Sequence, residues 1–380
     1  MGHLDFSALK GYNRIWFNIN NLKEENIMKK RIAMILTAAM VLSLVGCGGA
    51  QAQAPAAEAA PAAEETKEEA AEAQTEEAAE ASADGETYTV GICQLVEHPA
   101  LDAATKGFED AIKEELGDAV TFDEQNAQGD SNTCSTIINS FVSNNVNLIM
   151  ANATPALQAA MTATPTIPIV GTSVTDYATA LEIKDWKGTT GINVTGTADL
   201  APLAQQAAMI KELCPDAKTV GILYCSAEAN SVYQATVVAE ELQKLGYTTK
   251  EFTAADTNDI ASVTQTACDQ SDLIYIPTDN TMASATGTID PITSAAKKPV
   301  ITGEEGIAKG CGVATLSISY YSLGYKTGQM AAEILRDGKN PAEMPIAYAE
   351  ELTNKYVADR AKALGIKIPD TYEAIDMTAE

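Results

Sequence analysis

Six short segments of the chain concentrate residues that could bind a small polar molecule. Each follows a run of apolar residues, and together they are rich in hydroxyls, amides and carboxylates. Hydroxyls and free N–H groups at helix starts suit a carboxylate or phosphate, whereas carboxylates suit an ammonium. A single hydroxyl could equally be an ordinary helix N-cap, but the recurrence favours a site for a zwitterion. The segments are Gln94 to Ala100, Ala153 to Pro155, Gly171 to Ser173, Ser226 to Ser231, Thr278 to Thr281 and Gly303 to Gly306.

The residues needed for catalysis are scarce. The chain has only two histidines, His3 and His98, and it lacks the nucleophile-elbow, phosphate-loop and zinc-protease motifs. No glycine-rich dinucleotide fingerprint follows the apolar runs. Glu304 and Glu305 could do acid–base work, but neighbouring residues on a loop more often point apart. We therefore expect no enzyme activity, no catalytic residue, no cofactor and no metal site.

The elements that must position these segments form an internal repeat. The stretch Thr89 to Ile92 recurs as Thr219 to Ile222, and later apolar pairs recur in the same order. Each half alternates short apolar runs with amphipathic stretches, which is the pattern of parallel strands joined by covering helices. Because ligands bind beyond the carboxyl ends of such strands, the six segments should meet at one edge of each sheet.

The predicted elements follow from the same alternation. Strands are expected near 88–95, 119–124, 147–151, 167–171, 218–224, 247–252, 272–276, 298–302 and 312–317. Helices are expected near 99–116, 131–144, from Pro155, and near 198–213, 229–245, 258–269, 281–296 and 321–336.

Several of the loop sequences resemble one protein family. The stretches "EHPALDAATKGFEDAIKE", "NAQGD", "ATPALQAA", "SVTD", "SAEANSV", "IPTDNT", "EEG" and "SYYSLGYKTGQMAAEIL" are similar to the substrate-binding lipoproteins of ABC transporters, in the group with tryptophan- and tyrosine-binding members. The resemblance runs from about Tyr88 to Gly365. Tyr177 and Cys225 depart from the usual pattern, which leaves the ligand open.

The resemblance implies an α/β, type I periplasmic-binding fold, in which two Rossmann-like lobes with parallel sheets are joined by a three-crossover hinge. The crossovers should fall near 193–197, at Ser319 and near 344–350. Lobe 1 would comprise 88–196 with 319–343, and lobe 2 would comprise 197–318 with 344–380.

The resemblance also implies an extracytoplasmic receptor that closes around a small aromatic amino acid and hands it to an ABC permease. Thr154 and Ser173 are expected to bind the ligand carboxylate. Asp279, with Glu305 second, is expected to take the ammonium. Further ligand-binding candidates are Glu97, His98, Glu228, Asn230, Ser231, Thr278 and Asn280.

Alternatives to this function remain open. The same fold could bind a branched-chain amino acid, a sugar or a nucleoside, and it could serve as a sensory receptor that signals to a kinase. A secreted enzyme on a two-lobed scaffold is a further alternative.

The formal charge of −27 argues against nucleic-acid binding, since such a surface repels phosphate. The family resemblance implies a monomer.

The amino-terminal part carries an export signal. Met28 to Arg31 is a basic start, the following apolar stretch has signal-peptide length, and Leu44 to Cys47 resembles the bacterial lipobox. We therefore interpret 28–47 as a lipoprotein signal and Cys47 as the lipidated residue that anchors the protein to the outer face of the cytoplasmic membrane. Residues 1–27 fit no such signal and are interpreted as a non-native extension from a start codon placed too early.

The tract 48–87 is interpreted as a disordered tether. It holds eleven acidic residues against one lysine and no aromatic residue before Tyr88, so it cannot bury enough apolar surface to offset its chain entropy. A fluctuating helix is the alternative.

Six cysteines remain besides Cys47, and their wide spacing favours free thiols over disulfides. They are Cys93, Cys134, Cys214, Cys225, Cys268 and Cys311.

Overall fold

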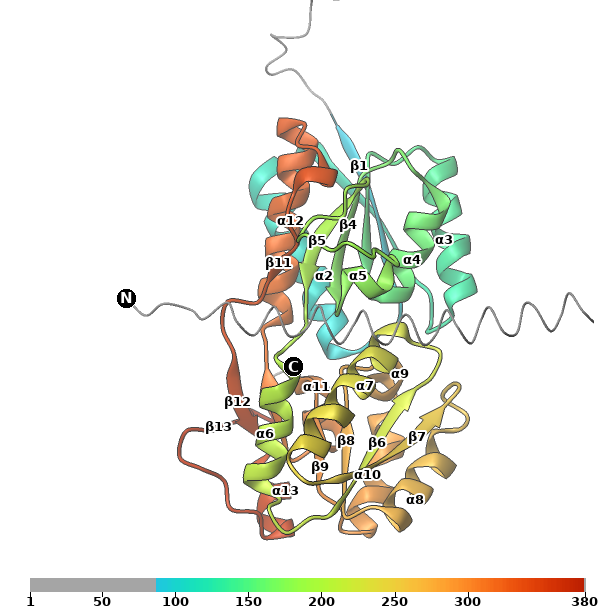
Figure 1. Ribbon diagram of the computed structural model, residues 1–380. Helices are drawn as coiled ribbons and strands as arrows, with labels where there is room; N and C mark the ends of the chain where they lie inside the picture. The colour runs from blue at the N-terminus through green and yellow to red at the C-terminus, as the bar shows by residue number, and fades with distance from the viewer. Residues whose placement is uncertain (1–86, 379–380) are drawn as a thin grey trace, which may run out of the picture. The chain divides into compact units, whose positions relative to one another are not determined.

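The computed structural model describes residues 87–378 (Figure 1). The extension 1–27, the signal 28–47 with Cys47, and all but the last residue of the tether 48–87 lie outside the described residues. Within them, none of the helices has the length and apolar character needed to cross a membrane.

The first sheet has six strands, and every neighbouring pair in it is parallel. Its central strands β3 and β1 are mostly apolar and are buried over nearly their whole length, as expected for strands covered on both faces. In spatial order the strands are β11 (Ala347–Tyr348), β5 (Val194–Ala198), β4 (Ile169–Val174), β3 (Leu148–Asn152), β1 (Tyr88–Gln94) and β2 (Val120–Asn126).

The second sheet has seven strands, and only its β10–β12 pair is antiparallel. In spatial order they are β13 (Glu373–Ala374), β12 (Thr353–Tyr356), β10 (Ala314–Ser317), β9 (Val300–Thr302), β8 (Leu273–Ile276), β6 (Thr219–Cys225) and β7 (Thr248–Ala254).

The two sheets repeat one topology. The order β2-β1-β3-β4-β5 in the first sheet corresponds to β7-β6-β8-β9-β10 in the second. The recurring segments Thr89 to Ile92 and Thr219 to Ile222 lie in β1 and β6, which occupy equivalent places. The predicted repeat and the predicted α/β class with two lobes are therefore confirmed.

Helices cover both faces of each sheet (Figure 1). On the first sheet, Val90 and Ile92 pack with α2 and α12, whereas Cys93 on the opposite face packs with α3, α4 and α5. The helices of this lobe are α2 (Pro99–Leu116), α3 (Ser131–Ser143), α4 (Thr154–Ala163), α5 (Tyr177–Ala180) and α12 (Tyr320–Asp337), with the 3-10 turns η1 (Gly117–Ala119) and η2 (Pro341–Glu343).

The second sheet is covered in the same way. Val220 and Ile222 face one apolar cluster with α6 and α7, and Leu223 faces another with α8 to α11. The helices are α6 (Leu203–Leu213), α7 (Ala229–Lys244), α8 (Ile260–Gln270), α9 (Asn280–Ser284), α10 (Thr286–Ala295), α11 (Glu305–Cys311) and α13 (Ala358–Leu364). The predicted helix 281–296 is thus two helices, interrupted at Ala285.

The chain passes between the two sheets three times. The first passage, 199–202, follows β5, so the crossover expected near 193–197 lies later than predicted because those residues form a strand of the first sheet. The second passage, 318–319, includes Ser319, where the second crossover is predicted. The third, 349–352, follows β11, which pairs with β5.

Helix α12 is held against α2 by close backbone contact. A side chain at Gly324 would collide with the backbone of Ala104, and one at Gly107 would collide with the backbone of Tyr321. Only glycine permits this approach. The contact fixes the start of α12, and with it Tyr320, beside the second passage between the sheets.

Candidate ligand-binding site

The first-lobe side of the site is built from the ends of β3 and β4. Thr154 opens α4 and is 2% exposed, so the start of this helix is buried. The residue before it, Ala153, has a φ of 93° and no side chain that could cap the helix. Buried helix starts normally have their N–H groups satisfied by a side chain, water or ligand. The N-terminus of α4 therefore has the chemistry of an anion site.

Ser173 lies beside this helix start in the sheet. Its φ of 54° places it in the left-handed region, which is uncommon for a residue other than glycine, asparagine or aspartate. It is 5% exposed, and its Oγ has no hydrogen-bond partner among the described residues. Strained backbone and an unpaired buried hydroxyl both occur preferentially at functional positions.

The second-lobe side is organised by Glu228, which precedes α7 and is 4% exposed. Its carboxylate accepts hydrogen bonds from Asn280 Nδ2 at 2.6 Å and from the N–H and hydroxyl of Thr281 at 2.9 and 2.7 Å. These bonds tie the start of α7 to the start of α9. Glu228 therefore has a structural role within this lobe, in addition to its predicted role in ligand binding.

Asp279 caps α9. Its Oδ1 accepts the N–H of Met282 at 2.8 Å, and its Oδ2 accepts the N–H of Cys225 at 2.6 Å. Burial, with the nearby Glu228 charge second, raises the pKa of Asp279 to about 7, and the hydrogen bonds oppose the shift. Both oxygens of the residue predicted to take the ammonium are therefore already occupied by backbone donors.

Asn230, Ser231 and Thr278 complete this side. Asn230 donates to Glu228 at 3.1 Å and to the Thr278 carbonyl at 3.2 Å, while its own Oδ1 has no partner among the described residues. Ser231 is fully buried, and Thr278 donates its N–H to Gln234 at 3.1 Å. Gln234, one helical turn beyond Asn230, was not predicted from the sequence.

Hydrogen bonds join the two lobes at this edge. His98 Nε2 lies 3.2 Å from Asn280 Oδ1, and Gln234 donates to Thr175 at 3.5 Å. Burial lowers the pKa of His98, although its bond to Asn280 opposes the shift. The predicted residues His98 and Asn280, 182 positions apart in the chain, are therefore brought together.

Two predicted residues stand apart from this network. Glu97 is exposed on the turn after β1. Glu305 is half-buried and pairs with Lys355 at 2.8 Å and with the Ser317 hydroxyl at 2.6 Å. Its neighbour Glu304 is the buried one, and it caps α11 through the N–H groups of Gly306 and Ile307.

The buried charges are all of one sign. Within 87–378, no lysine or arginine is buried, although four carboxylates are. Burying a carboxylate without a cation is costly, so it is retained where hydrogen bonds or a bound cation compensate. The four are Asp199, Glu228, Asp279 and Glu304.

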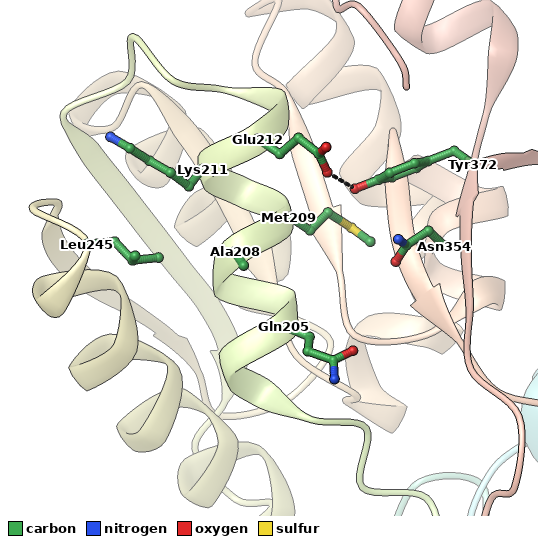
Figure 2. Close-up of a pocket in the computed structure, with 8 residues that line it drawn as sticks. All are labelled: Gln205, Ala208, Met209, Lys211, Glu212, Leu245, Asn354 and Tyr372. Atoms are coloured by element: carbon green, nitrogen blue, oxygen red, sulfur yellow. Dashed lines mark hydrogen bonds between the residues drawn. The ribbon is translucent and has the colours of Figure 1, made fainter. Parts of the chain in front are cut away.

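A separate hollow of about 480 Å³ lies on the second lobe (Figure 2). It is formed by α6 with Leu245, Asn354 and Tyr372, and the Tyr372 hydroxyl donates to Glu212 at 2.8 Å. None of the predicted ligand-binding residues lines it.

In the described range all six cysteines are free thiols, and no group of three metal-ligating side chains occurs.

The fold and the polar edge together define a class. Two doubly wound lobes, three passages between them and buried polar side chains at the strand ends are the features of a type I periplasmic-binding protein. Residues 89–376 match the family model described as ABC transporter substrate binding protein. The chain belongs to this family, whose role places it on the extracytoplasmic side of the membrane.

Three relatives carry the comparison further. A protein of Clostridioides difficile named as a tyrosine-binding protein is 35% identical over 281 residues, which are 73% of this chain and 81% of the relative. A Streptococcus pneumoniae domain solved in complex with L-Trp is 33% identical, with a TM-score of 0.73, over 76% of this chain and all of the other. A ligand-free, open substrate-binding protein with adhesive properties from Clostridium difficile is 35% identical, with a TM-score of 0.59, over 77% of this chain and all of the other.

Proposed function

We propose that this protein captures an aromatic amino acid between its two lobes and delivers it to an ABC permease, without catalysing a reaction. The observation that carries the proposal is the burial of an uncapped helix start and an acidic set of side chains at facing strand ends. An amino acid has the carboxylate and the ammonium that these groups suit. The named tyrosine-binding relative and the L-Trp complex support an aromatic side chain.

The ligand carboxylate is assigned to Thr154 and Ser173. The start of α4 supplies N–H groups and a partial positive charge, and Ser173 supplies a hydroxyl without a partner in the described structure. His98, Asn230 and Asn280 are assigned to the second-lobe side and to the contact between lobes. Glu228, Ser231 and Thr278 shape that side, while Glu97 and Glu305 have weaker claims. Asp279 stays a candidate for the ammonium.

Capture is proposed to occur by hinge closure. Lobe 1 (88–198 with 320–348) and lobe 2 (203–317 with 353–378) would move as bodies about the three passages, and both boundaries that follow β5 and β11 lie later than the sequence predicts. A ligand that contacts both lobes favours the closed arrangement by its differential affinity. The bonds from His98 and Gln234 across the lobes support closure, as does the higher TM-score to the L-Trp complex than to the open relative.

The remaining parts of the chain are proposed to hold the receptor at the membrane. Cys47 would carry the lipid, and the tract 48–87 would act as the tether that lets a monomeric receptor reach the permease. Mass spectrometry of the membrane-bound protein tests this part, because a diacylated amino-terminal Cys47 supports it and an unmodified Cys47 contradicts it.

A thermal-shift screen of the purified protein tests the function. The panel contains the twenty amino acids, common sugars and nucleosides, with D-tyrosine and D-tryptophan as controls for stereospecific contact. A ligand that binds only the native state raises the unfolding midpoint. We expect a shift with L-tyrosine, L-tryptophan or L-phenylalanine, and a shift confined to sugars or nucleosides would contradict the proposal.

A further inference from the structure

Asp199 is a buried carboxylate that belongs to none of the predicted segments. It lies in the first passage between the sheets, directly after β5, and it is 3% exposed. Its N–H donates to the carbonyl of Val174 at 3.2 Å, and Val174 pairs with Ala198 across β4 and β5. Asp199 is therefore adjacent in the sheet to the strand end that carries Ser173.

The carboxylate of Asp199 is only partly satisfied by the protein. Its Oδ2 accepts the hydroxyl of Tyr320 at 2.9 Å, while its Oδ1 has no hydrogen-bond partner among the described residues. Glu304 lies close enough for the two carboxylates to interact unfavourably. Burial raises the pKa of Asp199, and the hydrogen bond from Tyr320 opposes the shift.

The other three buried carboxylates differ from Asp199. Each of them uses both of its oxygens to accept hydrogen bonds from groups at the start of a helix or at the end of β6. The donors are Met282 and Cys225 for Asp279, Gly306 and Ile307 for Glu304, and Asn280 and Thr281 for Glu228. Asp199 alone among the four keeps a buried oxygen without a donor, and that oxygen suits a cationic ligand group.

We propose that Asp199 receives the α-ammonium of the ligand and that Tyr320 positions its carboxylate for this contact. The inference rests on the proposed capture of an amino acid. The ammonium and carboxylate of an amino acid are bonded to the same carbon atom, so the protein groups that bind them must lie close together. Adjacent strands lie about 4.8 Å apart, which matches receptors at the ends of β4 and β5.

The position of this pair links binding to the hinge. Asp199 lies in the first passage between the sheets, and Tyr320 begins α12 directly after the second. Their hydrogen bond joins two of the three segments about which the lobes would turn. A ligand ammonium held at Asp199 thus acts where closure is controlled, whereas Asp279 lies at the end of a strand in the second lobe alone.

The test compares an amino acid with its deaminated analogue. Calorimetry is performed on the wild-type protein and on Asp199→Asn with L-tyrosine and with 3-(4-hydroxyphenyl)propionate, which lacks the ammonium. Loss of a buried charge pair should weaken L-tyrosine binding by at least about 30-fold. The analogue should bind the variant as well as, or better than, the wild type. If L-tryptophan is the tighter ligand, indole-3-propionate replaces the analogue.

Three further variants make the test specific. Tyr320→Phe, which leaves Asp199 but removes its donor, should weaken L-tyrosine binding by about 3- to 10-fold. Asp176→Asn changes a partly exposed cap of α5 in the same lobe and should leave both affinities unchanged. Asp279→Asn tests the rival residue. Thermal unfolding without ligand checks folding, and Asp199→Asn should unfold at the same or a higher temperature because it removes a buried charge.

The outcomes separate the inference from the function. Unchanged L-tyrosine affinity in Asp199→Asn, or an equal loss for both ligands, would overturn the role of Asp199 while leaving amino-acid capture intact. Selective loss of L-tyrosine in Asp279→Asn would transfer the role to Asp279. A wild-type protein that binds no amino acid would overturn both the inference and the proposed function.

Discussion

The strand ends of the two sheets have the same topology but different polar chemistry. In the first lobe, the ends of β3 and β4 carry two residues with positive φ, Ala153 and Ser173, and a hydroxyl with no partner in the described structure. In the second lobe, the equivalent ends of β8 and β9 are followed by carboxylates that cap α9 and α11.

This difference indicates that the two lobes have different roles in ligand binding. Strain and unpaired polar groups lower stability, and they persist where a ligand uses them. Capped helix starts raise stability and hold their loops in one conformation. We infer that the first lobe supplies most of the direct ligand contacts, while the second supplies a preorganised surface that closes over the ligand.

The largest expected effect is on the stability of the second lobe. Asp279→Ala removes the acceptor for two buried N–H groups, those of Met282 and Cys225. We expect the free energy of unfolding to fall by about 2 to 4 kcal/mol, measured by urea denaturation. The sequence alone predicts a binding defect in an intact fold, and the capping bonds change that expectation.

A matched cap provides the control. Asp176, which is partly exposed, accepts the N–H of Thr179 at 2.7 Å at the start of α5, so Asp176→Ala should cost only about 1 kcal/mol. Equal losses in the two variants would contradict the distinction between the buried cap and the partly exposed one.

The first-lobe counterpart should affect binding and not folding. Ser173→Ala and Ser173→Gly both remove the hydroxyl, and each should weaken ligand binding by about 1 to 3 kcal/mol in calorimetry. Glycine tolerates the φ of 54°, so Ser173→Gly should be at least as stable as Ser173→Ala. Wild-type affinity in both variants would remove Ser173 from the site.

Stability should also depend on pH through the buried carboxylates. The pKa values of Asp279 and Glu304 are raised to about 7 by burial, above their ordinary values of 3.8 and 4.5. The folded state then binds protons more tightly than the unfolded state, so stability is lost as pH rises from about 4 through 7. We expect a decrease on the order of 1 to 3 kcal/mol between pH 5 and pH 8.

Urea titrations at several pH values measure this decrease. Glu304→Gln removes one of the titrating groups and should flatten the profile. A profile that rises across the same range, or one that the variant does not alter, would contradict the assignment of these raised pKa values.

The smallest expected effect concerns the contact between lobes. His98→Ala removes the bond to Asn280 but leaves the bonds that Glu228 makes within the second lobe. Ligand affinity should fall by about 0.5 to 1.5 kcal/mol, mainly through faster release measured by stopped-flow fluorescence. An unchanged release rate would show that this bond does not hold the lobes together.

Much of the fold follows from the sequence because its signals are local. Apolar runs set β1, β3, β6 and β8 within about two residues, and Pro99 marks the start of α2 as predicted. The short α5 and the short strands β11, β12 and β13 were not predicted, because a few residues carry no periodic pattern. Their conformation depends on pairing with distant strands, as β11 pairs with β5.

The site follows from the sequence only in part. The loops after strands could be identified because topology brings strand ends together, and His98 and Asn280 do meet. The roles of the carboxylates could not be identified, because the sequence does not distinguish a carboxylate that caps a helix from one that binds a ligand. Asp199 follows a strand that was not predicted, and Glu304 and Glu305 differ only in which of them is buried.

The most direct test of capture is a crystal structure of the protein grown with whichever of L-tyrosine and L-tryptophan gives the larger thermal shift. The account predicts a ligand between the lobes, with its carboxylate within hydrogen-bond distance of Ser173 and the start of α4. An amino acid bound in the hollow beside α6, or a carboxylate that contacts neither group, would contradict it.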